Sequence, residues 1–422
     1  MSAKVAPAQQ RLSHRRASVV GPQNPPDPSR VAEHVPRPGP EPRRVAGPLS
    51  GLLVVDLTHV LNGPFGTTIL GDLGARIIKI EPPGHGDDTR TFGPFYKGQS
   101  LYFSFVNRGK ESIVLNLKQD ADRAIFLNMV RRADVLTENF RPGAMDRLGF
   151  SYDELSKINP RLVYASSTGF GQTGPMRTFP AYDTIIQGMS GIMSITGSPD
   201  GPPTRVGTSV SDLIAGLFMF GGVAAALCAR EKTGKGCHVD VAMFDGTFSF
   251  LEQGLMHYAA TGTPAKRLGN RHPYMTPFDT FDAADKQFVI CCGNDHLFGE
   301  LCRCIGRPEL ATDARFLTDV ARTTNNVALK AEMEATLKQQ PAGHWLKVIH
   351  EAGVPVGPLH DVAEAAEHPQ TKARNMWIEA GGVNMPGNPV KMSGYEDPTE
   401  RVGAPSLDQH GAALRKEFAS DR

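Results

Sequence analysis

The chain has 422 residues, of which 40% are hydrophobic and 21% charged, as expected for a globular protein with two domains or one large domain with an insertion. Its formal net charge of +1 gives no reason to expect a nucleic-acid or membrane partner, although a small anion can still bind locally. The six cysteines lack the C-x₂₋₄-C spacing of a closed zinc site, so we expect reduced thiols, no metal and a cytoplasmic location.

The first 47 residues are rich in proline and arginine and contain no apolar segment of the kind found in signal peptides. Acidic residues at Asp27, Glu33 and Glu41 also argue against a transit peptide. We therefore predict that residues 1–47 form a disordered leader.

Strands and helices alternate from Gly51 onward. We expect strands at 52–57, 76–80, 111–117, 134–138 and 161–167, and helices at 65–73, 120–132 and 151–158. This alternation predicts a doubly wound α/β domain, whose ligands bind at the carboxyl ends of the strands. His59, Glu81, Asn139 and the loop 169–175 follow those strand ends.

The run from Leu213 to Ala229 carries no charge and is just long enough to span a membrane. Because it contains several glycines and follows an acid, we interpret it as a helix buried on all sides in a large core. Beyond residue 250, a hairpin at 277–282 and 287–292, with helices at 295–306 and 327–352, predicts a smaller α+β domain.

The sequence lacks the glycine-rich dinucleotide fingerprint, the P-loop, the serine-hydrolase elbow and the zinc-protease motif. Asp212 directly precedes the apolar helix, so it can act as an N-cap. A helix N-terminus also favours an ionised carboxylate and would lower its pKa. Such a carboxylate can act as a nucleophile that forms covalent acyl intermediates.

The other candidate residues each have a structural alternative. Asp183 can be an N-cap, Tyr182 a half-buried ring and His59 a structural histidine, while Lys118 and Arg147 can be solvated surface charges. Taken singly, these residues leave the function open.

Several ordered segments resemble the class III CoA-transferases, the formyl-CoA transferase or CaiB/BaiF-like family. They are Asp56–Pro64, Gly71–Ala75, Ile78–Glu81, Gly86–Arg90, Glu138–Gly143, Gly169–Pro175, Tyr182–Asp183, Thr233–Gly236 and Val239–Val241. The resemblance runs from Gly51 to the C-terminus and leaves out only the leader.

The resemblance implies a Rossmann-like large domain, a smaller α+β domain and an interlocked homodimer. It implies that residues 48–245 form the first part of the large domain, 246–352 the small domain with its linkers, and 353–422 the segment that completes the large domain. It further implies acyl-CoA and a small carboxylic acid as substrates, with no tightly bound cofactor.

By the same resemblance, the nucleophile falls on Asp212, with Tyr182, Asp183 and His59 beside it. The implied mechanism passes through aspartyl anhydride and aspartyl-CoA thioester intermediates. Coenzyme A would lie along six residues, namely His59, Val60, Lys118, Asn139, Phe140 and Arg147, since basic side chains neutralise phosphates.

Three departures bear on the substrate. Leu61 replaces a glutamine of formyl-CoA transferase, Pro82 a CoA-contacting arginine and Pro180 a lysine. The segments Gly84–Arg90 and Pro180–Asp183 look more like the branch that uses acetyl- or succinyl-CoA with dicarboxylates. Oxalate is the leading acceptor, and glutarate and itaconate remain open.

Two other functions remain. A 2-methylacyl-CoA racemase shares the fold but has a histidine at the position of Tyr182, and tyrosine, with a reference pKa near ~10, is a poor base. A non-catalytic CoA-binding protein has no chemical reason to retain Asp212, although an N-cap role could retain it.

Overall fold

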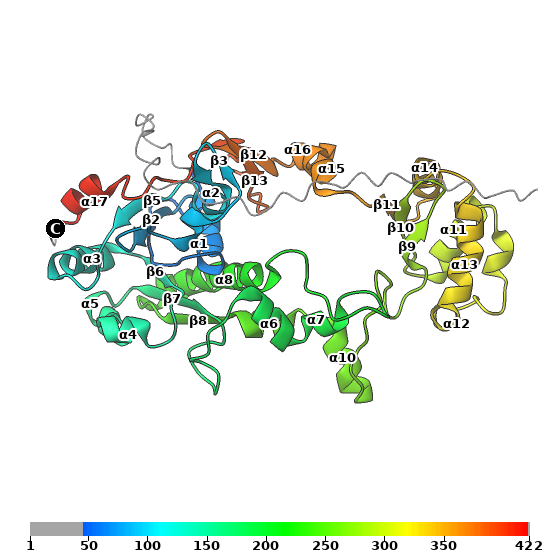
Figure 1. Ribbon diagram of the computed structural model, residues 1–422, viewed down its shortest axis with the longest axis horizontal. Helices are drawn as coiled ribbons and strands as arrows, with labels where there is room; N and C mark the ends of the chain where they lie inside the picture. The colour runs from blue at the N-terminus through cyan, green and yellow to red at the C-terminus, as the bar shows by residue number, and fades with distance from the viewer. Residues whose placement is uncertain (1–44, 421–422) are drawn as a thin grey trace, which may run out of the picture.

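The computed structural model describes residues 45–420, and these residues form two lobes (Figure 1). The predicted leader therefore lies outside the described residues except for 45–47. The larger lobe is built on a six-stranded sheet. Its strands are β1 (Leu53–Asp56), β2 (Arg76–Glu81), β5 (Glu111–Val114), β6 (Val135–Glu138), β7 (Val163–Thr168) and β8 (His238–Ala242).

All six strands are parallel and lie in the order β5-β2-β1-β6-β7-β8. Counted along the chain, this is the 3-2-1-4-5-6 order of the Rossmann fold, which confirms the predicted α/β class. The chain direction across the sheet reverses between β1 and β6, where Val54 pairs with Val135. In such sheets the ligand crevice opens at the carboxyl ends of these two central strands.

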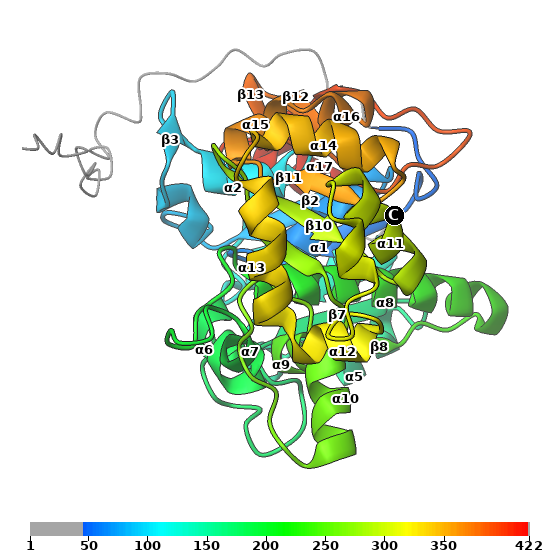
Figure 2. The ribbon, with the colours of Figure 1, turned by 90° about the vertical axis from the view of Figure 1, so that its right-hand side faces the viewer.

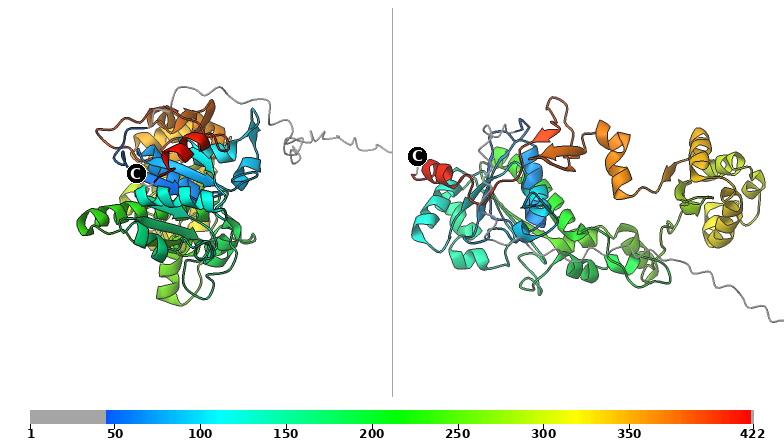
Figure 3. Two further views of the ribbon diagram at one scale, coloured as in Figure 1. Left: turned by 90° about the vertical axis from the view of Figure 1, so that its left-hand side faces the viewer. Right: turned by 45° about the horizontal axis from the view of Figure 1, so that its top comes forward.

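Helices cover both faces of this sheet (Figure 3). They are α1 (Asn62–Asp72), α3 (Asp120–Arg132), α4 (Ala144–Leu148), α5 (Tyr152–Ile158), α8 (Val210–Thr233) and α17 (Gly411–Glu417). Because side chains alternate along a strand, Val55 packs with α3, α5 and α17, whereas Val54 packs with α1 and α8. The predicted helix 120–132 is confirmed, and the one expected at 65–73 begins three residues earlier.

The α1 and α8 backbones touch each other where the two helices cross. A Cβ atom on Gly216 would lie 2.5 Å from the carbonyl oxygen of Asn62, and one on Gly66 would lie 2.7 Å from the carbonyl oxygen of Gly216. Only glycine fits at both positions, so the crossing holds the two backbones together without any intervening side chain.

The prediction that the apolar helix is buried on all sides is wrong for the described chain. Leu217 and Phe218 on α8 are each 45% exposed, although Met219 and Val223 are buried against the sheet. Within residues 45–420, α8 has the length and hydropathy of a membrane-spanning helix, but a buried core helix meets the same criterion.

The smaller lobe has its own core and faces the viewer in Figure 2. It contains β9 (Phe278–Asp282), β10 (Gln287–Cys291), β11 (Val356–Pro358), α11 (Asp295–Cys304), α12 (Asp319–Thr324), α13 (Asn326–Leu337) and α14 (Ala342–Glu351). β9 and β10 form the predicted hairpin. The single helical pattern expected at 327–352 is instead two helices, because Pro341 cannot continue α13 and precedes α14 as its N-cap.

The remaining elements connect the lobes and border the sheet. They are β3 (Phe95–Tyr96), β4 (Gln99–Ser100), α2 (Leu101–Asn107), α6 (Asp183–Ser190), α7 (Ile192–Ile195), α9 (Met243–Ser249), α10 (Glu252–Thr261), α15 (Val362–Glu367), α16 (Pro369–Ala373), β12 (Trp377–Ala380), β13 (Val383–Pro386) and β14 (Glu400–Arg401), with 3-10 turns at Asp88–Thr91 and Pro308–Ala311. The C-terminal segment returns to the larger lobe, where Glu417 pairs with Arg76. The domain boundaries expected from the resemblance stay a prediction.

Candidate functional site

The turns that follow β1 and β6 meet at the carboxyl edge of the sheet. The backbone N–H of His59 donates to Asn139 Oδ1 at 2.9 Å, and Asn139 Nδ2 donates to the His59 carbonyl oxygen at 2.8 Å. Phe140 packs against the His59 ring, with the ring centroids 5.5 Å apart. The structure thus brings together His59, Val60, Asn139 and Phe140, four of the six residues expected to bind CoA, at the crevice position of a Rossmann sheet.

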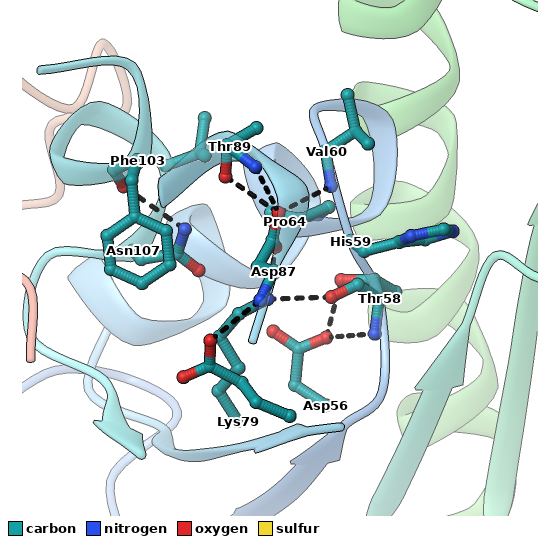
Figure 4. A network of polar contacts seen from close by, with 12 residues as sticks. Asp56, Thr58, His59, Val60, Pro64, Lys79, Asp87, Thr89, Phe103 and Asn107 are labelled. Atoms are coloured by element: carbon teal, nitrogen blue, oxygen red, sulfur yellow. Dashed lines mark hydrogen bonds and ion pairs between the residues drawn. The ribbon is translucent and has the colours of Figure 1, made fainter. Parts of the chain in front are cut away.

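A buried ion pair lies directly beneath the His59–Val60 turn (Figure 4). Lys79 Nζ lies 2.8 Å from Asp87 Oδ2 and donates to the carbonyl oxygen of Thr58 at 2.7 Å. Asp87 Oδ1 accepts from the Val60 N–H at 3.3 Å. Val60 has a φ of 64°, a strained value for a β-branched residue, so these contacts hold the turn in a conformation it would not adopt alone.

A second buried pair, Asp56 and Lys110, extends this network into the core, with Lys110 Nζ 2.9 Å from Asp56 Oδ2. Burial alone would raise the pKa of Asp56, but Lys110 and Lys79 outweigh burial and lower it. Burial lowers the pKa of Lys110 to about 8, against the opposing effect of Asp56. Burial likewise holds the pKa of His59 below its usual value, although Asp87 opposes it. These pairs fix the base of the site.

Lys118 and Arg147, the two cations expected to bind phosphates, also lie on the carboxyl side of the sheet. Lys118 follows β5 and Arg147 lies in α4, after β6, and both side chains are exposed. Within residues 45–420 neither side chain forms an ion pair or a hydrogen bond. Both are therefore available to a phosphate, although the structure does not bring them into contact with His59.

Asp212 lies in the first turn of α8, but it is not the N-cap of that helix. The N-cap is Ser209, and α8 begins at Val210. Asp183 supplies the capping carboxylate instead, because its Oδ1 accepts from the Ser211 N–H at 2.9 Å. The expected helix cap and the expected nucleophile are therefore two different residues.

The pKa of Asp212 is raised to about 7, first by burial and then by the nearby charge of Asp183. The prediction of a lowered pKa is wrong. The positive end of the helix stabilises the anion, but burial and the neighbouring charge of Asp183 destabilise it by more. Asp212 is a partly buried carboxyl group whose pKa lies close to neutral pH.

Gln187 holds the segment before Asp212 against α6. Its Nε2 donates to Asp183 Oδ2 at 2.8 Å and to the Thr208 carbonyl oxygen at 3.3 Å, and its Oε1 accepts from the Val206 N–H at 2.8 Å. The side chain is fully buried, and two of its three hydrogen bonds hold the segment that leads to Asp212. The sequence predicts that Gln187 lies in a helix. It gives no motif for the role of Gln187, because that role depends on burial and on contacts with residues 206–208.

Tyr182 and Asp183 stand where α6 begins. Tyr182 is the N-cap of α6 and is 73% exposed, so the alternative that it is a half-buried structural ring does not hold for the described chain. Asp183 is the first residue of α6 rather than its N-cap. Asp183 and Asp212 form an acidic pair, because the charge of Asp183 acts on the Asp212 carboxyl group, and Tyr182 directly precedes Asp183 in the chain.

Tyr102, which was not predicted from the sequence, lies near both the Asp183–Asp212 pair and the buried Asp87, because the charges of all three acids act on its hydroxyl. Its pKa is raised to about 12, first by burial and then by the charges of Asp212, Asp183 and Asp87. The tyrosine hydroxyl therefore stays protonated and can donate a hydrogen bond to an anion. It lies in α2, which has no chemical motif in the sequence to mark it.

The fold and the site can now be set beside known proteins. Residues 49–411 match the model of CoA-transferase family III. The chain belongs to CoA-transferase family III. It is 72% identical over 380 residues to the acetyl-CoA:oxalate CoA-transferase of Acetobacter aceti, covering 90% of this chain and 98% of that relative. It is 38% identical to the succinate–glutarate CoA-transferase of Agrobacterium fabrum, covering 84% and 93%.

A solved structure gives the same result for the family III fold. The crystal structure of a CaiB/BaiF family protein from Brucella suis aligns with a TM-score of 0.80 and 42% identity, covering 88% of this chain and all of that chain. The resemblance stated from the sequence is thereby confirmed, and the chain is a CoA-transferase. Among residues 45–420 no group of three or more metal-ligating side chains is clustered, and all six cysteines are unpaired.

Proposed function

We propose that this protein transfers CoA from acetyl-CoA to oxalate, with Asp212 as the nucleophile. The observation that carries the proposal is the position of Asp212, a partly buried carboxyl group next to Asp183. The 72% identity to an acetyl-CoA:oxalate CoA-transferase supports these two substrates. Succinyl-CoA as donor and glutarate as acceptor are the alternatives that the succinate–glutarate relative supports.

In the proposed reaction, the Asp212 carboxylate attacks the thioester carbonyl carbon, the C–S bond breaks, and CoA leaves as a thiolate. The thiolate then attacks the aspartyl carbonyl of the mixed anhydride, releasing acetate and leaving an aspartyl-CoA thioester. Oxalate displaces the thiolate, and the thiolate finally attacks the oxalyl carbonyl. Oxalyl-CoA leaves and the carboxylate of Asp212 is restored. Each step exchanges one activated acyl group for another, so no proton source or cofactor is required.

The proposal assigns the CoA moiety to His59, Val60, Asn139 and Phe140, with Lys118 and Arg147 as phosphate ligands. The unpaired state of those two cations supports it, because bringing a phosphate to them breaks no existing ion pair. Tyr182 and Asp183 adjoin the reacting carboxylate. The partners are acyl-CoA, a small carboxylic acid and a second copy of the chain in an interlocked homodimer. We place the protein in the cytoplasm, away from nucleic acid and membranes and without a tightly bound cofactor.

The direct test follows thioesters by mass spectrometry after acetyl-CoA and oxalate are mixed with the protein. We expect oxalyl-CoA from the unmodified chain. Asp212→Ala should lower transfer by about a thousandfold or more, because it removes the covalent step. Asp153→Ala is the matched control, since Asp153 is an exposed acid on α5. His59→Ala should retain measurable transfer, because His59 contacts CoA and takes no part in bond exchange.

Two outcomes would contradict the proposal. Unchanged transfer by Asp212→Ala would refute the site. Epimerisation of a 2-methylacyl-CoA without any acceptor acid would instead identify a racemase.

A further inference from the structure

A single guanidinium group lies beside the acidic pair at the nucleophile. Arg205 Nη2 is 3.8 Å from Asp183 Oδ2, and the Arg205 side chain is 44% exposed. Within residues 45–420 no other cation lies within 4.0 Å of a carboxylate oxygen of Asp183 or Asp212, and the guanidinium donates no hydrogen bond to a described residue. The donors of Arg205 are therefore free to bind a ligand.

The backbone around Arg205 is fixed relative to Asp212. The next residue, Val206, donates its N–H to Gln187, which also contacts Asp183 and the carbonyl oxygen of Thr208. The same segment enters α8 at Val210, two residues after Thr208, and carries Asp212 in the first turn of that helix. Arg205 and Asp212 thus project from one short segment anchored at both ends.

The carboxylate of Asp183 is already occupied by protein donors. Its Oδ1 accepts from the Ser211 N–H and its Oδ2 from Gln187. Arg205, at 3.8 Å, is too far away for a hydrogen bond with Asp183 and is not required for its fixation. The weak ion pair with Asp183 therefore leaves the hydrogen-bond donors of Arg205 unused.

The chemistry of a dicarboxylate acceptor requires a cation at this place. Only one of its carboxylates reacts with the aspartyl group, while the other stays ionised through the anhydride and thioester steps. A free carboxylate next to Asp183 and Asp212 is repelled unless a positive charge compensates it. The planar fork of arginine matches a carboxylate in a bidentate geometry.

We propose that Arg205 is the specificity-determining residue that binds the non-reacting carboxylate of a dicarboxylate acceptor. The inference rests on the proposed transfer through Asp212 and adds the residue that selects the acceptor class. An acetyl donor has no second carboxylate, so Arg205 contributes to recognition of the acceptor and not to recognition of acetyl-CoA. A succinyl donor, in contrast, carries a free carboxylate and also depends on Arg205.

The test compares Arg205→Met and Arg205→Lys with the unmodified chain in two reactions. The first is exchange of labelled acetate into acetyl-CoA, which uses Asp212 but no dicarboxylate. The second is transfer from acetyl-CoA to oxalate. Arg161→Met is the matched control, because Arg161 is 49% exposed, pairs with the exposed Glu231 and precedes β7, at the amino-terminal end of the sheet.

We expect Arg205→Met to lower kcat/KM for oxalate by about 10- to 100-fold, the range that a charge-assisted hydrogen-bonded pair supplies. Arg205→Lys, which keeps the charge but loses the fork, should lower it less. Acetate exchange should change by less than about threefold in both variants, and this also shows that they are folded. With succinyl-CoA as donor, Arg205→Met should lower kcat/KM for the donor as well.

Unchanged kcat/KM for oxalate in Arg205→Met would overturn the inference. So would an equal loss of acetate exchange and oxalate transfer, because Arg205 would then support the site in general. Two pairs of acceptors of equal length extend the test: oxalate with acetate, and glutarate with valerate. The inference is also overturned if the unmodified chain prefers the dicarboxylate in neither pair. Failure of the proposed function gives a different result from failure of this inference. In that case the unmodified chain shows no acetate exchange, or the Asp212→Ala variant still exchanges acetate.

Discussion

Asp212 lies in the first turn of α8 and also beside Asp183, and these two surroundings act on its pKa in opposite directions. The amides of the helix N-terminus favour the anion, while burial and the second acid disfavour it. The sequence places Asp212 correctly at the start of the helix. It cannot give the direction of the pKa shift, because both causes, burial first and then the charge of Asp183 on α6, depend on how distant parts of the chain pack together.

A pH profile tests this balance. With its pKa raised to about 7, Asp212 is protonated below neutral pH and ionised above it. Only the ionised form is a nucleophile, so kcat/KM for acetyl-CoA should rise with pH through about 7 and fall about tenfold per pH unit well below it. Asp183→Asn removes one cause of the raised pKa, so the midpoint should move to lower pH.

The shift in Asp183→Asn should be partial, because burial is the larger cause and remains. A midpoint that stays in place would show that Asp183 does not act on Asp212 through its charge. Asp153→Asn, at an exposed position on α5, should leave the profile unchanged.

At the scale of elements, α6 and α8 are joined by side-chain hydrogen bonds rather than by apolar packing alone. Asp183 caps the first turn of α8, and Gln187 holds the residues that lead into it. The alternation of strands and helices predicts the sheet and most of its helices, because each depends on a local pattern. The cap and the Gln187 contacts pair residues from different elements, and local pattern carries no information about them.

Replacing Gln187 with methionine tests this coupling. The change removes three hydrogen bonds at similar side-chain length, so the Asp212 segment should shift while the His59–Val60 turn stays in place. We expect kcat to fall by about 10- to 100-fold, as small displacements of reacting groups do, with KM for acetyl-CoA changed by less than about twofold. Steady-state kinetics with each substrate varied in turn provides the measurement.

Gln339→Met is the control for this variant, because Gln339 is an exposed residue just beyond the end of α13. A rise in KM for acetyl-CoA equal to the fall in kcat would show that Gln187 stabilises the whole site and not only the position of Asp212.

At the scale of the whole molecule, large apolar side chains remain exposed along α8, α9 and α10. Besides Leu217 and Phe218 they include Phe248, Phe250 and Met256, which are 45%, 52% and 65% exposed. The rings of Phe218 and Phe250 lie 6.2 Å apart, and exposed apolar side chains that gather in this way are typical of a protein interface. The uncharged run predicts the helix. It does not show whether the outer side of the helix is covered by the same chain or by a second one, and for this reason the prediction of full burial was wrong.

A homodimer would cover this surface, and its stoichiometry can be measured. We expect light scattering after size-exclusion chromatography, without detergent, to give twice the mass of the 422-residue chain. Phe250→Asp combined with Met256→Asp should shift the protein to monomer or aggregate, because each change buries a charge. Val362→Asp, at an 88% exposed position on α15, should remain a dimer. A monomer in the unmodified chain would contradict the expectation.

The contact between Gly66 and Gly216 has a consequence for how the acceptor specificity of this fold can change during evolution. Gly216 lies one helical turn after Asp212, and the Asn62 carbonyl it touches belongs to a residue whose side chain accepts from Asn139. The carboxyl group of Asp212 and the turns around His59 and Asn139 are therefore held at a separation set by two main chains in contact. With the proposed role of Arg205, a substitution there would alter the choice of acid while that separation is maintained. Selectivity and bond exchange can in this way evolve as separate properties of one fold.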